Sequence, residues 1–128
     1  MRVVVIIARI LLGLIFLIVG LNMFVHFLPA PPITGYPATF LGVLAASHYV
    51  YVLGAVQVLA GLMLLTNQFV PLAEIVLAAV LVNIFTYHIT MSPSGLPLPL
   101  FTLLLWFIVG FSLRSHFEPL FVRKVANG

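Results

Sequence analysis

The residues of this chain that could do chemistry are few, and most of them interrupt long apolar stretches. Their imidazole and amide groups could hydrogen-bond a small molecule; they are Asn22, His26, His48, Gln57 and His88. Asn22 and His26 are four residues apart, so on a helix they are neighbours on one face. Polar groups inside apolar segments are costly and commonly mark a functional site, so each of these residues is a candidate for binding.

Composition predicts that the elements positioning these residues are membrane-spanning helices. The chain has 128 residues, of which 64% are hydrophobic and 5% charged, whereas a soluble domain carries about 25% charged residues. A helix needs roughly 20 apolar residues to cross the hydrocarbon core. We therefore expect one all-α integral membrane domain, 1–128, with an interfacial segment at about 38–46. Its core is expected to be a four-transmembrane-helix bundle, with spans at about 3–28, 47–65, 70–91 and 97–113.

The basic residues predict the orientation of these helices. Four spans place both termini and the 66–70 turn on one side, and all the Lys and Arg residues fall there: Arg2, Arg9, Arg114, Arg123 and Lys124. The two loops on the opposite face contain none. Because basic residues stay on the cytoplasmic side, both termini and the tail 114–128 are predicted to be cytoplasmic. The length of the first stretch and the charge within it favour a retained span over a cleaved signal peptide.

Three histidines are expected near the extracytoplasmic ends of the first three spans: His26, His48 and His88. Three imidazoles at one depth can bind zinc or copper. However, His48 is nine residues from Gln57, which places the two on opposite sides of an ideal helix. Three interpretations stay open. The histidines form a metal site, or His26 and His88 form a polar small-molecule site beside Tyr87, or they only anchor the helices at the headgroup level.

Two opposite charges are expected at similar depth near the cytoplasmic side. Arg9 lies about two turns into the first span and Glu74 about one turn into the third. We expect an intramembrane ion pair between them, because an isolated charge in hydrocarbon is costly. Such a pair either fixes how the two helices dock, or also holds an anionic headgroup or relays a proton.

Glycine stripes predict where two helices approach each other closely. Gly13 and Gly20 lie near one face of the first span, and Gly54 and Gly61 flank Gln57 in the second. Small residues let helix backbones approach within a membrane. These stripes are therefore expected to be helix-packing surfaces.

A second polar stripe occurs on the third span, on the side away from Glu74. It consists of Asn83, Thr86 and Thr90. Either this helix is buried all round, or the stripe meets another subunit. The chain is accordingly expected to be a homo-oligomer or a subunit of a larger membrane complex, surrounded by membrane lipids.

Several function classes are disfavoured by what the sequence lacks. It has no cysteine, so it cannot supply thiolate ligands, disulfides or an iron–sulfur cluster. Its five Lys and Arg residues against two acids follow from membrane topology, and no nucleic-acid-binding face is expected. No nucleotide motif or nucleophile–base pair is evident. Catalysis by the chain alone is therefore not expected, and a partner or bound cofactor would carry any electrons.

Four groups of motifs extend over nearly the whole chain. They are Arg9–Phe16 with Gly20–Asn22; Gln57–Leu65; Pro71 with His88; and the segment from Asn22 through His26 to Pro29. Together they resemble the DoxX-like family of small four-helix membrane proteins. The resemblance implies a multi-pass protein of the bacterial or archaeal cytoplasmic (inner) membrane. It also implies association with quinol-oxidase, thiosulfate:quinone oxidoreductase or redox-defence systems, although Gln57 stands where the family often has an acidic residue.

The favoured hypothesis is a redox-associated membrane subunit that binds a quinone or another lipid-like small molecule within the helix bundle. The expected ligand-binding residues are Asn22, His26, Gln57, Tyr87 and His88. Two alternatives stay open. The chain is a structural or assembly subunit without chemistry of its own, or it binds a metal or a tetrapyrrole through its outer histidines.

Overall fold

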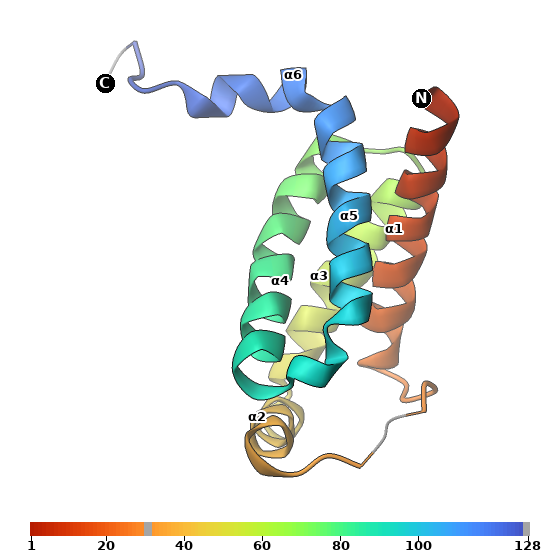
Figure 1. Ribbon diagram of the computed structural model, residues 1–128, viewed down its shortest axis with the longest axis vertical. Helices are drawn as coiled ribbons and strands as arrows, with labels where there is room; N and C mark the ends of the chain where they lie inside the picture. The colour runs from red at the N-terminus through yellow and green to blue at the C-terminus, as the bar shows by residue number, and fades with distance from the viewer. Residues whose placement is uncertain (30–31, 127–128) are drawn as a thin grey trace.

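The computed structural model describes residues 1–29 and 32–126, and within these ranges every regular element is helical (Figure 1). In chain order the elements are α1 (Arg2–Asn22), α2 (Gly35–Ala46), α3 (Tyr49–Leu65), α4 (Val70–Met91), η1 (Pro93–Gly95), α5 (Pro97–Ser112), α6 (Arg114–Phe117) and η2 (Glu118–Phe121). The expectation of an all-α protein is confirmed for this part of the chain.

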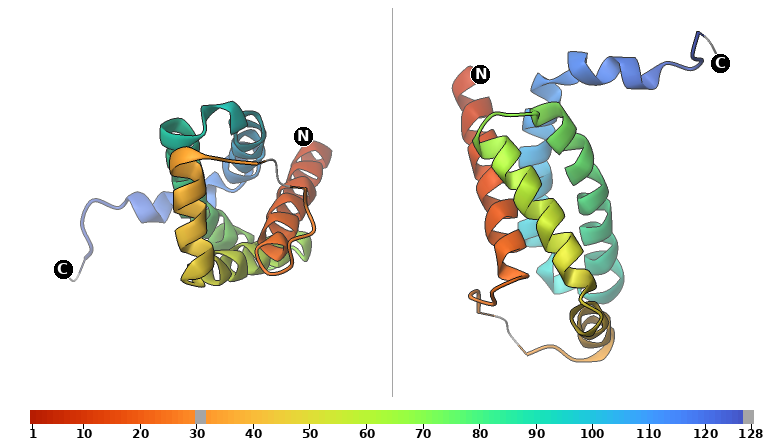
Figure 2. Two further views of the ribbon diagram at one scale, coloured as in Figure 1. Left: turned by 90° about the horizontal axis from the view of Figure 1, so that it is seen from below. Right: turned by 180° about the vertical axis from the view of Figure 1, so that it is seen from behind.

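Four long helices, α1, α3, α4 and α5, lie side by side (Figure 1). Both α3 and α5 contact α1 on one side and α4 on the other. Helix α2 lies across one end of these helices, and α6 with η2 runs sideways from the opposite end (Figure 2). The N-terminus lies at the same end as α6 (Figure 1). One end of the molecule therefore carries the N-terminus and α6, and the other carries α2.

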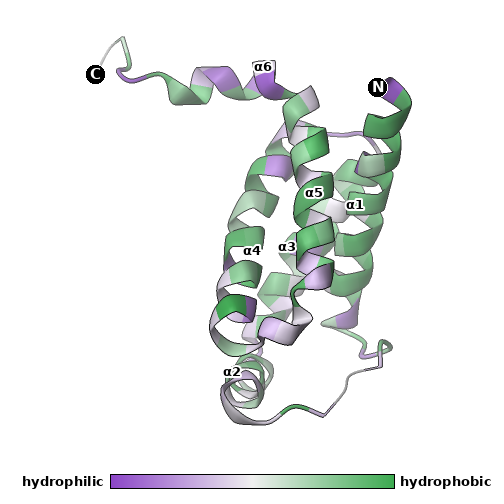
Figure 3. Ribbon diagram, in the orientation of Figure 1, coloured by the Kyte–Doolittle hydropathy of each residue, from purple (hydrophilic) through white to green (hydrophobic). Residues whose placement is uncertain are grey.

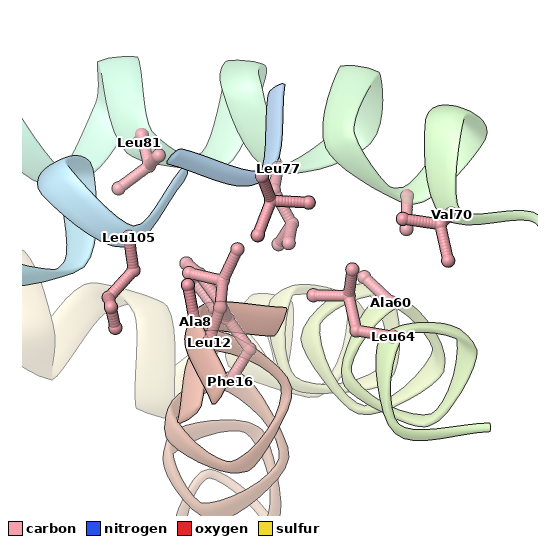
Figure 4. Packing of buried hydrophobic residues seen from close by; sticks show 11 residues of the cluster. Ala8, Leu12, Phe16, Ala60, Leu64, Val70, Leu77, Leu81 and Leu105 are labelled. Atoms are coloured by element: carbon pink, nitrogen blue, oxygen red, sulfur yellow. The ribbon is translucent and has the colours of Figure 1, made fainter. Parts of the chain in front are cut away.

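Aliphatic and aromatic side chains form most of the core between the four helices. Leu12 and Phe16 of α1 meet Leu64 of α3 and Leu77 of α4 there, and all four are fully buried (Figure 4). Such interiors pack as densely as organic crystals, so these residues fix the spacing of the helices.

Polarity is distributed unusually between the inside and the outside. Gln57 and Glu74 are buried, whereas Leu59 is 61% exposed and Val82 66% exposed on the same two helices. Apolar residues dominate the visible length of the four helices, and the polar positions gather towards their ends (Figure 3). A soluble monomer rarely exposes an apolar surface of this extent, so the outer face requires an apolar partner or an apolar solvent.

Two helices, α1 and α4, are long and apolar enough to cross a membrane. The α2–α3 pair bends by 86° and the α5–α6/η2 pair by 81°, and up to four spans result if each bent pair counts as one. In the first pair the bend falls at His48, whose φ of 64° is left-handed. The described chain therefore has two to four possible membrane-spanning helices.

Helices α1 and α3 approach each other through two pairs of glycines. A Cβ added at Gly61 would lie 2.8 Å from the carbonyl oxygen of Gly13, and one added at Gly54 would lie 2.9 Å from that of Gly20. Real Cβ atoms do not come so close to backbone, so only glycine fits at both places. The glycine stripes therefore form the contact between the first two long helices.

The helix boundaries follow the sequence except at the end of α1. Helices α3, α4 and α5 begin and end within two residues of the expected spans. The expected first helix to Leu28 is wrong, because α1 ends at Asn22. There the Oδ1 atom of Asn22 accepts hydrogen bonds from the backbone N–H groups of Phe27, at 3.0 Å, and Leu28, at 2.8 Å. The Asn22 side chain therefore stabilises a turn after α1, which the continuous run of apolar residues does not reveal.

Candidate functional site

A cavity of about 200 Å³ lies between the long helices, on the half nearer α2. Residues of α1, α3, α4, η1 and α5 line it, and most of them are apolar, including Phe16, Val19 and Leu81. Three polar side chains interrupt this wall, and they come from three different helices: Gln57, His88 and Thr102. An apolar cavity with a few converging polar groups is the usual form of a small-molecule site.

Gln57, which lines the cavity, carries an unpaired polar atom. Its side chain is 4% exposed. The Nε2 group donates to the carbonyl oxygen of Leu53 at 3.2 Å and lies 3.6 Å from the sulfur of Met23. The Oε1 atom is buried without a hydrogen-bond partner. Leaving a buried acceptor unpaired costs about 1–3 kcal/mol, so this position favours a group that donates a hydrogen bond.

His88 is held in one orientation by its own helix. Its Nδ1 atom lies 2.8 Å from the carbonyl oxygen of Ile84. A carbonyl can only accept, so Nδ1 carries the proton and donates. In the neutral imidazole, Nε2 is then the acceptor. Gly95 of η1 packs against the same ring edge, where a Cβ would meet Nε2 at 3.1 Å.

Thr102 of α5 is the polar cavity residue that sequence reasoning missed. It is 4% exposed, and its hydroxyl donates to the carbonyl oxygen of Leu98 at 2.9 Å. The hydroxyl oxygen keeps its ability to accept. A signal was present, because Thr102 is the one hydroxyl side chain between Pro97 and Phe111.

Tyr87 is placed behind His88 rather than in the cavity wall. Its ring meets the imidazole edge to face, with 4.9 Å between ring centroids and 89° between ring planes. The ring of Phe40 in α2 stacks on that of Tyr87, with 5.7 Å between ring centroids. Aromatic pairs of this geometry are favourable, so Tyr87 is a positioning residue for His88.

Asn22 and His26 line a second cavity, of about 450 Å³, together with residues of α2 and the start of α3. The Oδ1 atom of Asn22 is already occupied by two backbone N–H groups, and His26 is exposed. The expected site joining Asn22 and His26 to His88 is therefore divided between two cavities. The early end of α1 is the physical reason, because the residues after Asn22 leave the helix axis.

The three outer histidines do not converge. His48 stands before the first turn of α3, exposed, and stacks on Tyr51 with 5.6 Å between ring centroids. Within residues 1–29 and 32–126 no group of three or more His, Cys, Asp or Glu side chains is placed to hold a metal ion. The metal interpretation of His26, His48 and His88 thus receives no support from their positions.

The expected ion pair between Arg9 and Glu74 is not formed. The guanidinium of Arg9 donates to the backbone carbonyl of Leu64, in the last turn of α3. The carboxylate oxygens of Glu74 are buried without a hydrogen-bond partner. A helix C-terminus carries partial negative charge and open carbonyls, so it attracts the cation in place of the carboxylate.

Glu74 instead belongs to the contact between α4 and α5. Its side chain is fully buried, and a Cβ at Gly110 of α5 would lie 3.0 Å from its Oε2 atom. The indole N–H of Trp106, also on α5, donates to the backbone carbonyl of Glu74 at 2.9 Å. Trp106 thus fixes the α4–α5 contact with a hydrogen bond.

Comparison with known proteins gives no further assignment. No protein-family model matches the chain, and no curated protein or solved structure matches it. The function must therefore be argued from the cavity and the helices themselves.

Proposed function

We propose that the chain is a membrane protein of four spans with both termini in the cytoplasm. The exposed apolar faces of the long helices support this, because they suit a hydrocarbon solvent. Arg2 begins α1 and Arg114 begins α6, at the same end of the molecule (Figure 1). The positive-inside rule assigns that end to the cytoplasm and the α2 end to the opposite side.

We further propose that this is a DoxX-like subunit of a quinone-linked redox system and binds a quinone or another lipid-like small molecule. The single observation that carries the binding proposal is the cavity, in which Gln57, His88 and Thr102 interrupt an otherwise apolar wall. The three polar groups would hold the head of such a molecule, and the apolar wall would exclude water from it.

The size of the cavity specifies how such a molecule would lie. Sites that enclose a drug-sized ligand measure about 300–1,000 Å³, and this cavity measures about 200 Å³. It therefore accommodates a head group and leaves a long tail outside. Leu98 lines the cavity and is 56% exposed, so the tail would leave past α5 towards the lipid.

The chain's own part in the redox chemistry would be binding and orientation. The described cavity wall supplies neutral hydrogen-bonding groups, with no acidic or basic side chain other than the imidazole. The ligand and a partner subunit would supply the electron carriers.

The experiment is to purify the full chain from membranes, identify co-purified lipid-soluble molecules by mass spectrometry, and titrate the protein with decylubiquinone. We expect a bound quinone or saturable binding, and the binding of the reduced form, decylubiquinol, should weaken several-fold in Gln57→Leu. Asn83→Leu is the matched control, because Asn83 is an exposed amide on α4. If no quinone co-purifies and no saturable binding is seen, the proposal is overturned. The alternative of an assembly subunit then stands.

A further inference from the structure

The polar side-chain atoms of the cavity wall that remain available to a ligand are all hydrogen-bond acceptors. The donor groups of the three polar side chains are already used. Gln57 donates to the carbonyl of Leu53 and to the sulfur of Met23, His88 donates to the carbonyl of Ile84, and Thr102 donates to that of Leu98. What remains is the amide oxygen of Gln57, the Nε2 lone pair of a neutral His88 and the hydroxyl oxygen of Thr102.

The backbone carbonyls fix these assignments. Turning the Gln57 amide over would set its oxygen against the carbonyl of Leu53, oxygen to oxygen. Turning the His88 ring over would replace the N–H that donates to Ile84 by a C–H. Each reversal loses a hydrogen bond, and the first also creates a repulsion. The acceptor character of the wall therefore follows from helix geometry.

From this pattern we infer that the cavity selects ligands by hydrogen-bond direction and prefers a neutral head group that donates. For a quinone couple this means the reduced hydroquinone, whose hydroxyl groups donate, over the oxidised quinone, whose carbonyl oxygens only accept. A quinone oxygen facing His88 Nε2 would leave both atoms unpaired. This inference rests on the proposed function and names the form of the ligand that the same site takes.

Two of the acceptors act together on the ligand. The Nε2 atom of His88, which is half-buried, meets the ligand at the cavity surface. The Oε1 atom of Gln57 is covered, and a shift of its side chain would bring it to the second donor. One additional hydrogen bond at a buried acceptor corresponds to about tenfold in affinity.

The test compares decylubiquinol with decylubiquinone, which share ring and tail, on the full chain in lipid nanodiscs under anaerobic conditions. We expect the quinol to bind about tenfold more tightly. Because the bound couple is shifted towards its reduced form, its midpoint potential should rise by about 30 mV for each tenfold preference.

Variants isolate the cause of the preference. Gln57→Leu removes one acceptor and should reduce the quinol-to-quinone affinity ratio several-fold, mainly by weakening quinol. Thr102→Val keeps the shape of the wall and should reduce the ratio less, because a hydroxyl oxygen is a weaker acceptor than an amide oxygen. Asn83→Leu should leave the ratio unchanged. Should a variant fail to fold, the ratio and midpoint potential of the unaltered chain still decide the matter.

The outcomes separate this inference from the proposed function. Equal affinity for the two forms, or tighter binding of the quinone, would overturn the donor preference and leave quinone binding standing. Binding of neither form would overturn both.

Discussion

His88 of α4 and Gly95 of η1 pack so closely that a Cβ added at Gly95 would lie 2.8 Å from Cδ2 of the imidazole. The ring thus has fixed neighbours on several sides, because Ile84 accepts from Nδ1 and Tyr87 meets it edge to face. Gly95 is consequently part of the site although it has no side chain to contribute.

Gly95→Ala should push the imidazole of His88 out of line without breaking the helices around it. We expect decylubiquinol affinity to fall about tenfold, the equivalent of one hydrogen bond, while thermal stability changes little. The matched control is Gly42→Ala in α2, where an added Cβ meets nothing within 4 Å. Identical affinity in the two alanine variants would show that the ring position does not matter for binding.

Arg9 and Glu74 should behave as independent residues in a double-mutant cycle. With Arg9 bonded to Leu64 and the Glu74 carboxylate unpaired, the effects of Arg9→Met and Glu74→Gln on unfolding free energy should add. The expected coupling is below about 0.5 kcal/mol. Denaturant titration in mixed micelles of the unaltered chain, the two single variants and the double variant measures this coupling. A coupling well above about 1 kcal/mol would show that Arg9 and Glu74 do form an ion pair.

Gly61→Ala should destabilise the protein because its Cβ would meet backbone atoms. The carbonyl oxygen of Gly13 and the N–H nitrogen of Leu17 would both lie 2.8 Å away, so α1 and α3 must separate. Overpacking of this kind costs about 1–3 kcal/mol. The same micelle titration, again with Gly42→Ala as the control, should show that loss. Equal stability of the two variants would contradict the close helix contact.

The four-span topology predicts which positions a membrane-impermeant maleimide can reach. The chain has no cysteine, so single cysteines report unambiguously. Gln68→Cys and Ser115→Cys should label only from the cytoplasmic side, and Thr34→Cys and Ser94→Cys only from the opposite side. Intact cells and inverted vesicles supply the two sides. Labelling of Gln68→Cys and Thr34→Cys from the same side would rule out the proposed topology.

Hydropathy and turn residues were sufficient to predict most of the helices. Pro71 and Pro97 lie in the first turns of α4 and α5, where a missing backbone N–H costs nothing, and these helices begin where expected. Hydropathy and turn residues do not predict the end of α1. Apolar residues continue to Leu28, and the signal was instead the side chain of Asn22 folding back onto the backbone.

The site was predicted in part. The sequence indicated Gln57 and His88 as candidates, and the structure places both at one cavity. Depth in the membrane, however, groups residues by level and not by direction around the helices. Depth alone therefore groups His26 with His88 and Arg9 with Glu74. In the structure, His26 lines the second cavity and Arg9 donates to a carbonyl at the end of α3.

The most direct measurement of the central claim is photolabelling with a short-tailed azidoquinone, followed by peptide mapping. If the head group occupies the cavity, label should fall on the lining segments 15–19, 81–88 and 95–102, and excess decylubiquinol should prevent it. Label confined to the second cavity around His26, or spread over the lipid-facing surfaces and insensitive to competitor, would contradict the account.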